Sequence, residues 1–334
     1  MTVLQRIASG ITGHLSLVFV GAMAVGLLWQ ELAAVVQPTM RYGLMLVIYI
    51  GFLTVDLGRL KQELKSWRYH VYLLVLLQLA IPALIYVVLR VATSPLPNAH
   101  AWSLGMLLVL AAPAGAITPS ICLMFNAKFE RSLLIVITTS MLVPLTLPLL
   151  LRVASGHAMQ LPLEPIEAFL TMIVVLPAVA AVLTRRFAPR VVGVIEPRIA
   201  LLSVLCLSMI IIGLVAGLRD HLTAKPGILA EMVGISAAAF LTAYALGWFA
   251  GAKKEWPDRM TVAISATWTN VGLAIVLANE FFREAMPLVV LFTVTASISW
   301  NATLVPGQWL ASRFDDASAG PAQADGGGRS RHTD

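Results

Sequence analysis

Ala112-Pro113-Ala114-Gly115-Ala116-Ile117-Thr118-Pro119 decides the fold, because this stretch lies inside an apolar run from about Trp102 to Phe125. Such a run is long enough to cross a bilayer, at roughly 20 residues per crossing. The two prolines and the glycine remove backbone donors and favour non-helical torsions. In hydrocarbon, freed backbone groups are tolerated only where they face protein or a water-filled cavity. The stretch therefore predicts a helix that breaks within the membrane and marks a site.

A second interrupted run lies about 154 residues further along the chain. There Thr267-Trp268-Thr269-Asn270-Val271-Gly272 places hydrogen-bonding side chains and a glycine inside the apolar run from about Met260 to Ala278. Breaks at corresponding places in two halves of a chain are typical of transporter binding sites. Kinks packed against neighbouring helices are the alternative, since Pro and Gly are frequent in membrane helices. The pairing of the two breaks favours the site.

The composition excludes an ordinary soluble domain. Hydrophobic residues make up 59% of the 334 residues, charged residues make up 12%, and the mean hydropathy is +0.86. The basic residues behind the formal charge of +6 lie in short loops, so they indicate membrane topology rather than nucleic-acid binding. Cys122 and Cys206 lie inside apolar runs and predict neither a disulfide framework nor a metal site. We therefore expect a protein whose surroundings are the lipid bilayer and which binds no nucleic acid.

Ten apolar runs follow one another, and each is expected to form a membrane-spanning helix. They lie at about 14–34, 43–57, 71–91, 102–125, 133–151, 166–183, 199–218, 228–251, 260–278 and 285–310. The fourth run of each set of five is the broken one. Because five is odd, the second set must enter the membrane in the opposite sense. The sequence thus predicts an all-α polytopic membrane protein with two inverted five-helix repeats, 14–153 and 165–312, in one transmembrane transporter domain, 1–312.

The Lys and Arg residues are concentrated in alternate connections. The N-terminus, the even-to-odd loops and the C-terminal end hold about 17 of the 23. Since connections rich in Lys and Arg stay cytoplasmic, both termini are expected on the cytoplasmic side of the cell inner membrane. Residues 313–334 are too polar to bury a core and are expected to form a disordered cytoplasmic tail.

Several features resemble the bile acid:sodium symporter family, part of the bile/arsenite/riboflavin transporter superfamily. They are the break with Pro113 and Gly115, Gln78 in the third run, Asn270-Val271-Gly272-Leu273-Ala274 in the ninth, and Trp300-Asn301 in the tenth. The similarity covers about residues 17–313. It implies a panel domain, a core domain, and crossed, discontinuous fourth and ninth helices. It further implies substrate and sodium sites in the core domain, and substrates that are amphipathic or small organic anions, such as bile acids and pantoate-like carboxylates.

The positions that match the family's sodium ligands depart from its pattern. Ser265 and Thr269 stand where the family has a glutamate and a glutamine, Thr118-Pro119 replaces a Ser-Asn pair, and Val136 replaces a threonine. The positions that the resemblance marks as an altered sodium site are Gln78, Ser132 and Ser265. Because the carboxylate and other oxygen ligands of the family are absent, sodium binding is expected to be severely weakened. Sodium binding by a remodelled neutral site, uncoupled facilitation and exchange all stay open, and no other cofactor is expected.

The two breaks also favour an anion. Half-helices that restart after them present free backbone N–H groups and the positive end of the helix dipole near the bilayer midplane. The side chains expected around a small organic anion are Thr118, Ser120, Thr267, Thr269, Asn270 and Asn301. Trp268 and Trp300 are expected to supply an apolar wall for the substrate. Helix packing by the hydroxyls and lipid anchoring by the tryptophans are the alternatives.

Two other functions stay open beside a secondary transporter that works by alternating access. An arsenite-type efflux carrier relies on a reactive cysteine in the fourth helix, whereas Cys122 lies a turn after Thr118. A non-transporting membrane sensor or scaffold of the same fold would allow the altered sodium positions, although the tail has no recognisable signalling domain. An enzyme is not expected, because no nucleophile, base and orienting group fall together in the loops.

Overall fold

The computed structural model describes residues 15–53, 63–155, 161–195, 198–215, 226–303 and 305–310. Within these ranges the chain is helical, and no strand longer than an isolated bridge occurs. The all-α prediction is therefore confirmed for the described residues. The predicted tail, 313–334, lies outside them.

Several helical segments have the length and composition of membrane spans. Five are long enough by themselves: Gln30–Leu53, Trp67–Ala92, Phe129–Ala154, Leu163–Phe187 and Gly227–Ala250. Shorter apolar helices lie at Ala99–Ala111, Leu201–Gly213, Val271–Phe282 and Pro287–Ser299. Two of these shorter helices, Ala99–Ala111 and Val271–Phe282, adjoin the predicted breaks, so a break accounts for their length.

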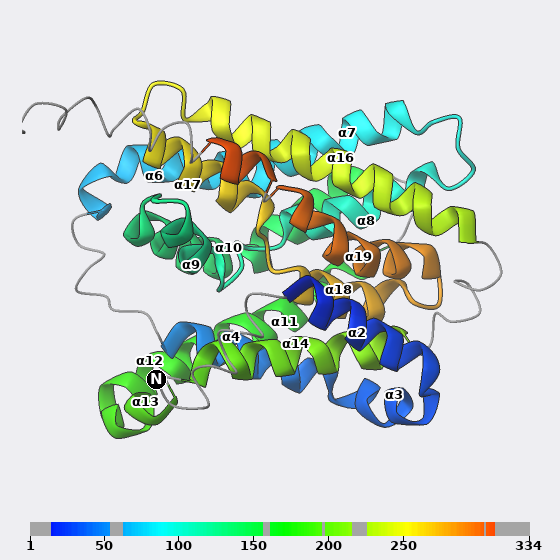
Figure 1. The fold of residues 1–334 in the computed structure, drawn as a ribbon, viewed down its shortest axis with the longest axis horizontal. Coiled ribbons are helices and arrows are strands. Elements are labelled where there is room, and N and C mark those ends of the chain that lie inside the picture. The colour runs from blue at the N-terminus through cyan, green and yellow to red at the C-terminus, as the bar shows by residue number, and fades with distance from the viewer. Residues whose placement is uncertain are drawn as a thin grey trace, which may run out of the picture.

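The described helices form two groups (Figure 1). The panel group, at the bottom of Figure 1, consists of α2 (Leu15–Leu28), α3 (Gln30–Val36), α4 (Met40–Leu53), α12 (Leu176–Phe187), α13 (Pro189–Ile195) and α14 (Ile199–Val215). The core group consists of α6 (Trp67–Val75), α7 (Ile81–Ala92), α8 (Ala99–Ala111), α9 (Thr118–Met124), α10 (Phe129–Ser155), α16 (Pro226–Ala250), α17 (Trp256–Thr267), α18 (Val271–Phe282) and α19 (Pro287–Ser299). Between the groups, α11 (Leu163–Leu170) packs against α10 and leads into α12, which packs against α4. This division agrees with the panel and core domains that the resemblance implies.

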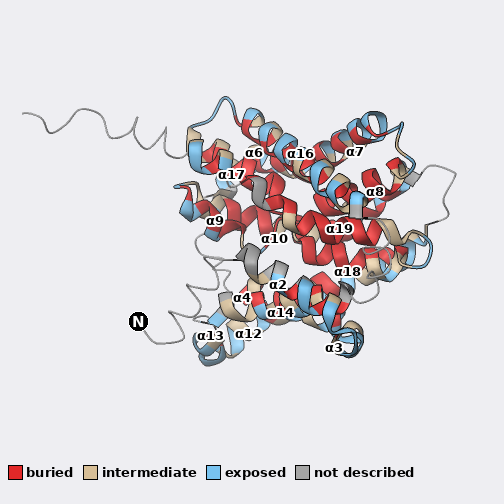
Figure 2. Cartoon of the chain, turned by 45° about the vertical axis from the view of Figure 1, so that its right-hand side comes forward, coloured by how far each residue is buried: buried red, intermediate tan, exposed pale blue. Residues whose placement is uncertain are grey.

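The burial pattern explains the arrangement. Every residue of α8 from Ala101 to Ala111 is buried, as is α18 from Val271 to Ala278 (Figure 2). A helix that is apolar on all sides must be surrounded by protein. By contrast, α7 exposes Leu84, Val87, Val88 and Val91 along one side. Such an apolar face suits lipid, because hydrocarbon tails are as apolar as the side chains.

The predicted boundary between the first two runs is wrong. The structure ends α2 at Leu28 and continues in helical conformation from Gln30 to Leu53. Pro38 does not break this segment, because it stands in the first turn of a short 3₁₀ helix, where a missing N–H is tolerated. Gln30 and Glu31 interrupt the apolar run instead, and Glu31 places an acidic group in the first turn of α3.

The tenth run also differs from the expected continuous helix. The α-helical part of α19 ends at Ser299, and the 3₁₀ helix η7 (Trp300–Thr303) follows. Pro306 disfavours a continuous α-helix through this stretch, because it has no N–H to bond the carbonyl four residues earlier, at Ala302. A third interruption therefore lies in the core group, close to the second break in sequence.

Prolines also explain two wider helical turns. The π-helical segments η3 (Leu76–Ala80) and η4 (Thr171–Val175) precede Pro82 and Pro177. Each proline removes the N–H that would bond the carbonyl four residues before it, which lies inside the π segment. Gln78 thus lies in a widened turn, from which its side chain reaches α10.

Candidate functional site

Both predicted helix breaks are present. The first lies between the end of α8 at Ala111 and the start of α9 at Thr118. The second lies between the end of α17 at Thr267 and the start of α18 at Val271. Pro119 fits the first turn of α9, where its missing N–H costs nothing. The prediction of two interrupted helices is confirmed.

The two breaks meet and pair with each other. Ala114 and Thr269 form an antiparallel bridge. The Gly115 N–H donates to the Trp268 carbonyl at 2.8 Å, and the Asn270 N–H donates to the Pro113 carbonyl at 2.7 Å. Backbone groups freed by the breaks are therefore satisfied by the opposite break, as an apolar environment requires. We call this pair of segments, 112–117 and 268–270, the crossing.

Gly115 is required by this close approach. A Cβ added there would lie 3.2 Å from the carbonyl oxygens of both Trp268 and Thr269. Any side chain at this position would push the paired segments apart. The glycine that the sequence placed in the first break thus has a packing reason in the structure.

Threonine hydroxyls fasten the crossing from both sides. Thr118 Oγ1 donates to the Trp268 carbonyl at 2.8 Å, and Thr269 Oγ1 donates to the Val109 carbonyl at 2.7 Å. The Ala114 N–H donates to Thr139 Oγ1 of α10 at 3.2 Å. Thr118 and Thr269 are buried, and their hydroxyl protons are engaged with backbone carbonyls. In this conformation the two threonines hold the crossing together.

The other residues expected around an anion are placed differently. Asn270 is half-buried and caps α18, with its Oδ1 accepting from the Leu273 N–H at 3.1 Å. Thr267 donates back to carbonyls of its own helix, and Ser120 is exposed on α9. The side chain of Asn301 lies outside the described residues. The structure thus brings Thr118, Thr269 and Asn270 to the crossing and leaves Ser120 away from it.

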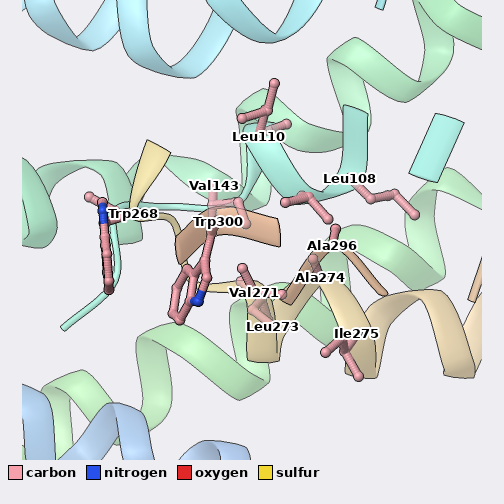
Figure 3. Packing of buried hydrophobic residues seen from close by; sticks show 14 of the residues in the cluster. Leu108, Leu110, Val143, Trp268, Val271, Leu273, Ala274, Ile275, Ala296 and Trp300 are labelled. Atoms are coloured by element: carbon pink, nitrogen blue, oxygen red, sulfur yellow. The ribbon is translucent and has the colours of Figure 1, made fainter. Parts of the chain in front are cut away.

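A pair of stacked tryptophans adjoins the crossing (Figure 3). The rings of Trp268 and Trp300 are 4.7 Å apart and inclined by 25°. The two residues are 2% and 8% exposed, so the lipid-anchor alternative is wrong. Trp268 Nε1 donates to Thr303 Oγ1 at 3.2 Å, whereas the buried Nε1 of Trp300 has no partner among the described residues.

The crossing faces the panel group. A Cβ at Gly51 of α4 would lie 2.9 Å from the Cβ of Ala116. A Cβ at Gly272, in the first turn of α18, would lie 3.0 Å from Leu207 Cδ2 of α14 and 3.6 Å from Leu44 Cδ1 of α4. Glycines therefore allow close contact between the two groups of helices at the crossing.

The altered sodium positions lie in the core group. Gln78 Nε2 donates to the Thr139 carbonyl at 3.0 Å, and Gln78 Oε1 accepts from Thr146 Oγ1 at 3.4 Å. Ser132 on α10 and Ser265 on α17 are buried, and neither hydroxyl has a hydrogen-bond partner in the described part of the chain. The described residues also contain no cluster of three or more His, Cys, Asp or Glu that could hold a metal ion.

One charge network, centred on the buried Asp258, was missed by sequence reasoning. Asp258, in the first turn of α17, pairs with Arg131 and, at 2.8 Å, with Lys128. Arg131 also pairs with Glu63 at 2.7 Å. The sequence shows Lys128 and Arg131 only as part of a charged turn before α10. The available signal was Asp258 directly after Pro257, an arrangement that favours a helix N-terminus.

Comparison with known proteins gives two matches. The family model described as Sodium Bile acid symporter family matches residues 41–225, more than half of the chain. This range contains the first break and ends before the second. A Bacillus subtilis (strain 168) protein, the uncharacterized sodium-dependent transporter YocS, is 28% identical over 205 residues, which cover 59% of this chain. The match spans 61% of that relative's length, less than two thirds.

Proposed function

The chain belongs to the sodium bile acid symporter family, as its sequence features indicated, and we propose that it is a secondary transporter of a small organic anion. The observation that carries the proposal is the crossing. Two helices that end and restart beside each other within apolar surroundings are a structural feature of transporter binding sites. A structural scaffold has no need for such a break, because each freed backbone group must be satisfied again.

The proposal includes ten spans in two inverted five-helix repeats, 14–153 and 165–312, within one domain, 1–312. In this scheme α8 and α9 form the fourth span, and α17 and α18 form the ninth. The antiparallel bridge between Ala114 and Thr269 supports it, because a twofold axis in the membrane plane runs equivalent segments in opposite directions. Alternating access would then be a rocking of the core group against the panel group at the contacts made by Gly51 and Gly272.

The anion is placed where α18 begins, at the boundary between the two groups. The positive end of this helix dipole favours a carboxylate. Asn270 is half-buried there, and its amide N–H₂ group would donate to a carboxylate oxygen. Neither break contains an acidic residue that would repel an anion. Thr118 and Thr269 would position the crossing, and Asn301, which follows Trp300, is the further candidate donor.

The distribution of Lys and Arg supports an inner-membrane location with both termini cytoplasmic. On this orientation the network of Glu63, Lys128, Arg131 and Asp258 lies at the cytoplasmic end of the core group. The arsenite alternative has less support, because Cys122 is fully buried beneath α10 and α17 rather than in the crossing.

Uptake into proteoliposomes tests the proposal. The purified protein is reconstituted and offered radiolabelled carboxylates, both small hydroxy acids and bile acids, with arsenite as a separate arm. We expect uptake of at least one carboxylate above protein-free liposomes, and its loss in Asn270→Leu. The matched control is Asn279→Leu, the same change nine residues further along α18, where the side chain accepts a hydrogen bond from Arg283. Arsenite uptake alone, or equal uptake by both variants, would contradict the proposed site.

A further inference from the structure

The family name and the relative's name both imply sodium, so the residues that would hold it can be tested for fit. Ser132 and Ser265 mark the place: they are 0% and 3% exposed, and their hydroxyls lack partners among the described residues. The Cys122 thiol lies beside Ser132 and Thr261, but a thiol is only a weak hydrogen-bonding group. Ser265 follows Thr261 by one turn of α17, and α9, α10 and α17 pack against one another. We use the name neutral pocket for the group of Cys122, Ser132, Thr261 and Ser265 on these three helices.

The pocket offers few free oxygen atoms that could act as ligands to a cation. A hard cation in a protein is held by several oxygens, preferably with carboxylates among them. Pro119 and Val136, at matching ligand positions, contribute no side-chain oxygen. Both ends of the Gln78 amide are hydrogen-bonded to α10. Thr261 accepts from the Lys128 N–H and donates to the Pro257 carbonyl.

Two backbone carbonyls of the crossing are already engaged. Its carbonyls at Pro113 and Trp268 accept hydrogen bonds from Asn270, Gly115 and Thr118. The crossing therefore satisfies these groups internally. Within the neutral pocket, the described hydroxyls of Ser132 and Ser265 remain free, and both are neutral.

The local charges give a cation no support. The nearest acidic side chain on α17 is Asp258, seven residues before Ser265 and roughly 10 Å away along the helix at 1.5 Å per residue. Its carboxylate is paired with Arg131 and Lys128. Arg131, which directly precedes Ser132 in α10, is paired with Asp258 and Glu63, so this network leaves no acidic group free to attract a cation. A desolvated sodium ion would have no uncompensated negative group to pair with.

We infer that the neutral pocket does not bind sodium, and that this chain transports its substrate without a sodium gradient. Two unpartnered hydroxyls suit a neutral hydrogen-bonding guest such as water, which needs two to four polar neighbours. The transport half of the inference rests on the proposed function. The binding half concerns the pocket alone and is measured without any substrate.

Thermal unfolding of the full-length protein in detergent tests the binding half. The midpoint is measured in NaCl, KCl and choline chloride at equal ionic strength, because a ligand that binds the native state raises it. We expect the same midpoint in all three salts. A rise specific to sodium that disappears in the Ser132→Ala/Ser265→Ala double variant would overturn the inference.

Ser265→Glu supplies the missing charge, and Ser265→Gln is its size-matched neutral control. We expect Ser265→Glu to unfold earlier than the wild type in KCl and to gain a sodium-specific rise in midpoint, with no such rise for Ser265→Gln. A folded Ser265→Glu protein with the same unfolding midpoint in NaCl and KCl would overturn the reasoning that the missing carboxylate is what prevents sodium binding. If Ser265→Glu fails to fold, the wild-type salt comparison still decides the binding half.

Uptake with an inward sodium gradient, compared with sodium-free buffer, tests the transport half. We expect equal initial rates for any carboxylate that the wild type accumulates, and a several-fold faster rate with sodium would overturn the inference. Absence of uptake under both conditions would instead count against the proposed function, while the unfolding result would stand.

Discussion

Replacing Gly115 with alanine perturbs the crossing at its tightest point. The new Cβ would stand 3.2 Å from two backbone carbonyl oxygens, those of Trp268 and Thr269, which is closer than ordinary van der Waals contact. Backbone atoms cannot rotate away as a flexible side chain can. The two segments must therefore separate by a few tenths of an ångström.

This separation strains the hydrogen bonds that join the breaks. Overpacking of a well-packed interior costs about 1–3 kcal/mol. The affected bonds are Gly115 N–H to Trp268, at 2.8 Å, and Asn270 N–H to Pro113, at 2.7 Å. We expect Gly115→Ala to lower the free energy of unfolding by about 1–3 kcal/mol. We also expect it to slow transport under conditions in which the protein is still folded.

The assay is reversible unfolding in mixed micelles, combined with proteoliposome uptake. Gly234→Ala on α16 is the control, because nothing lies within 4 Å of a Cβ there. In that exposed helical position alanine should stabilise the protein by about 0.5–1 kcal/mol. A Gly115→Ala protein as stable and as active as the wild type would refute the close pairing of the breaks.

Three further predictions concern the surrounding contacts. Thr118→Val removes a buried hydrogen bond to the Trp268 carbonyl and should cost about 1 kcal/mol in an unfolding measurement, whereas the exposed Thr242→Val should change stability by less than about 0.5 kcal/mol. Trp268→Phe loses the bond to Thr303 and should destabilise the protein by about 1 kcal/mol more than Trp300→Phe, whose indole N–H has no described partner; equal losses would argue against this difference. Asp258→Asn removes the charge that Arg131 pairs with beside Glu63 and should cost about 1.5–3 kcal/mol, with part of the loss recovered when Arg131→Met is added; an additive double variant would show that the two residues do not interact.

The sequence was sufficient for the fold class and for both breaks, because these depend on local chemistry. Apolar runs of membrane length, interrupted by Pro113, Pro119 and Gly115, determine where helices form and stop. The same reasoning applied to Pro306 would have predicted the end of α19. The helix end near Trp29 was not predicted, because Trp29 lies inside an apolar run with no proline or glycine beside it.

The pairing of distant groups could not be predicted. Arg131 and Asp258 are 127 residues apart, and nothing local shows that one neutralises the other. Likewise, the sequence identifies Thr118 and Thr269 as hydroxyl donors but does not show that backbone carbonyls take their protons. Properties that follow from one segment were predictable, whereas those that need two segments to meet required the structure.

A disulfide between the two breaks tests the crossing most directly. Ala114→Cys and Thr269→Cys are introduced into a chain whose Cys122 and Cys206 are replaced by alanine, and cross-linking is followed in native membranes. Residues paired in an antiparallel bridge have Cα atoms about 4.5–5.5 Å apart, within the range that a disulfide spans.

The pair Ala114→Cys and Ala278→Cys is the control, since Ala278 lies nine residues, roughly 13 Å along the chain axis, beyond Thr269. We predict rapid cross-linking for positions 114 and 269 and none for the control pair. No disulfide between 114 and 269 under oxidising conditions, in a folded protein, would contradict the meeting of the two helix breaks on which the proposed site depends.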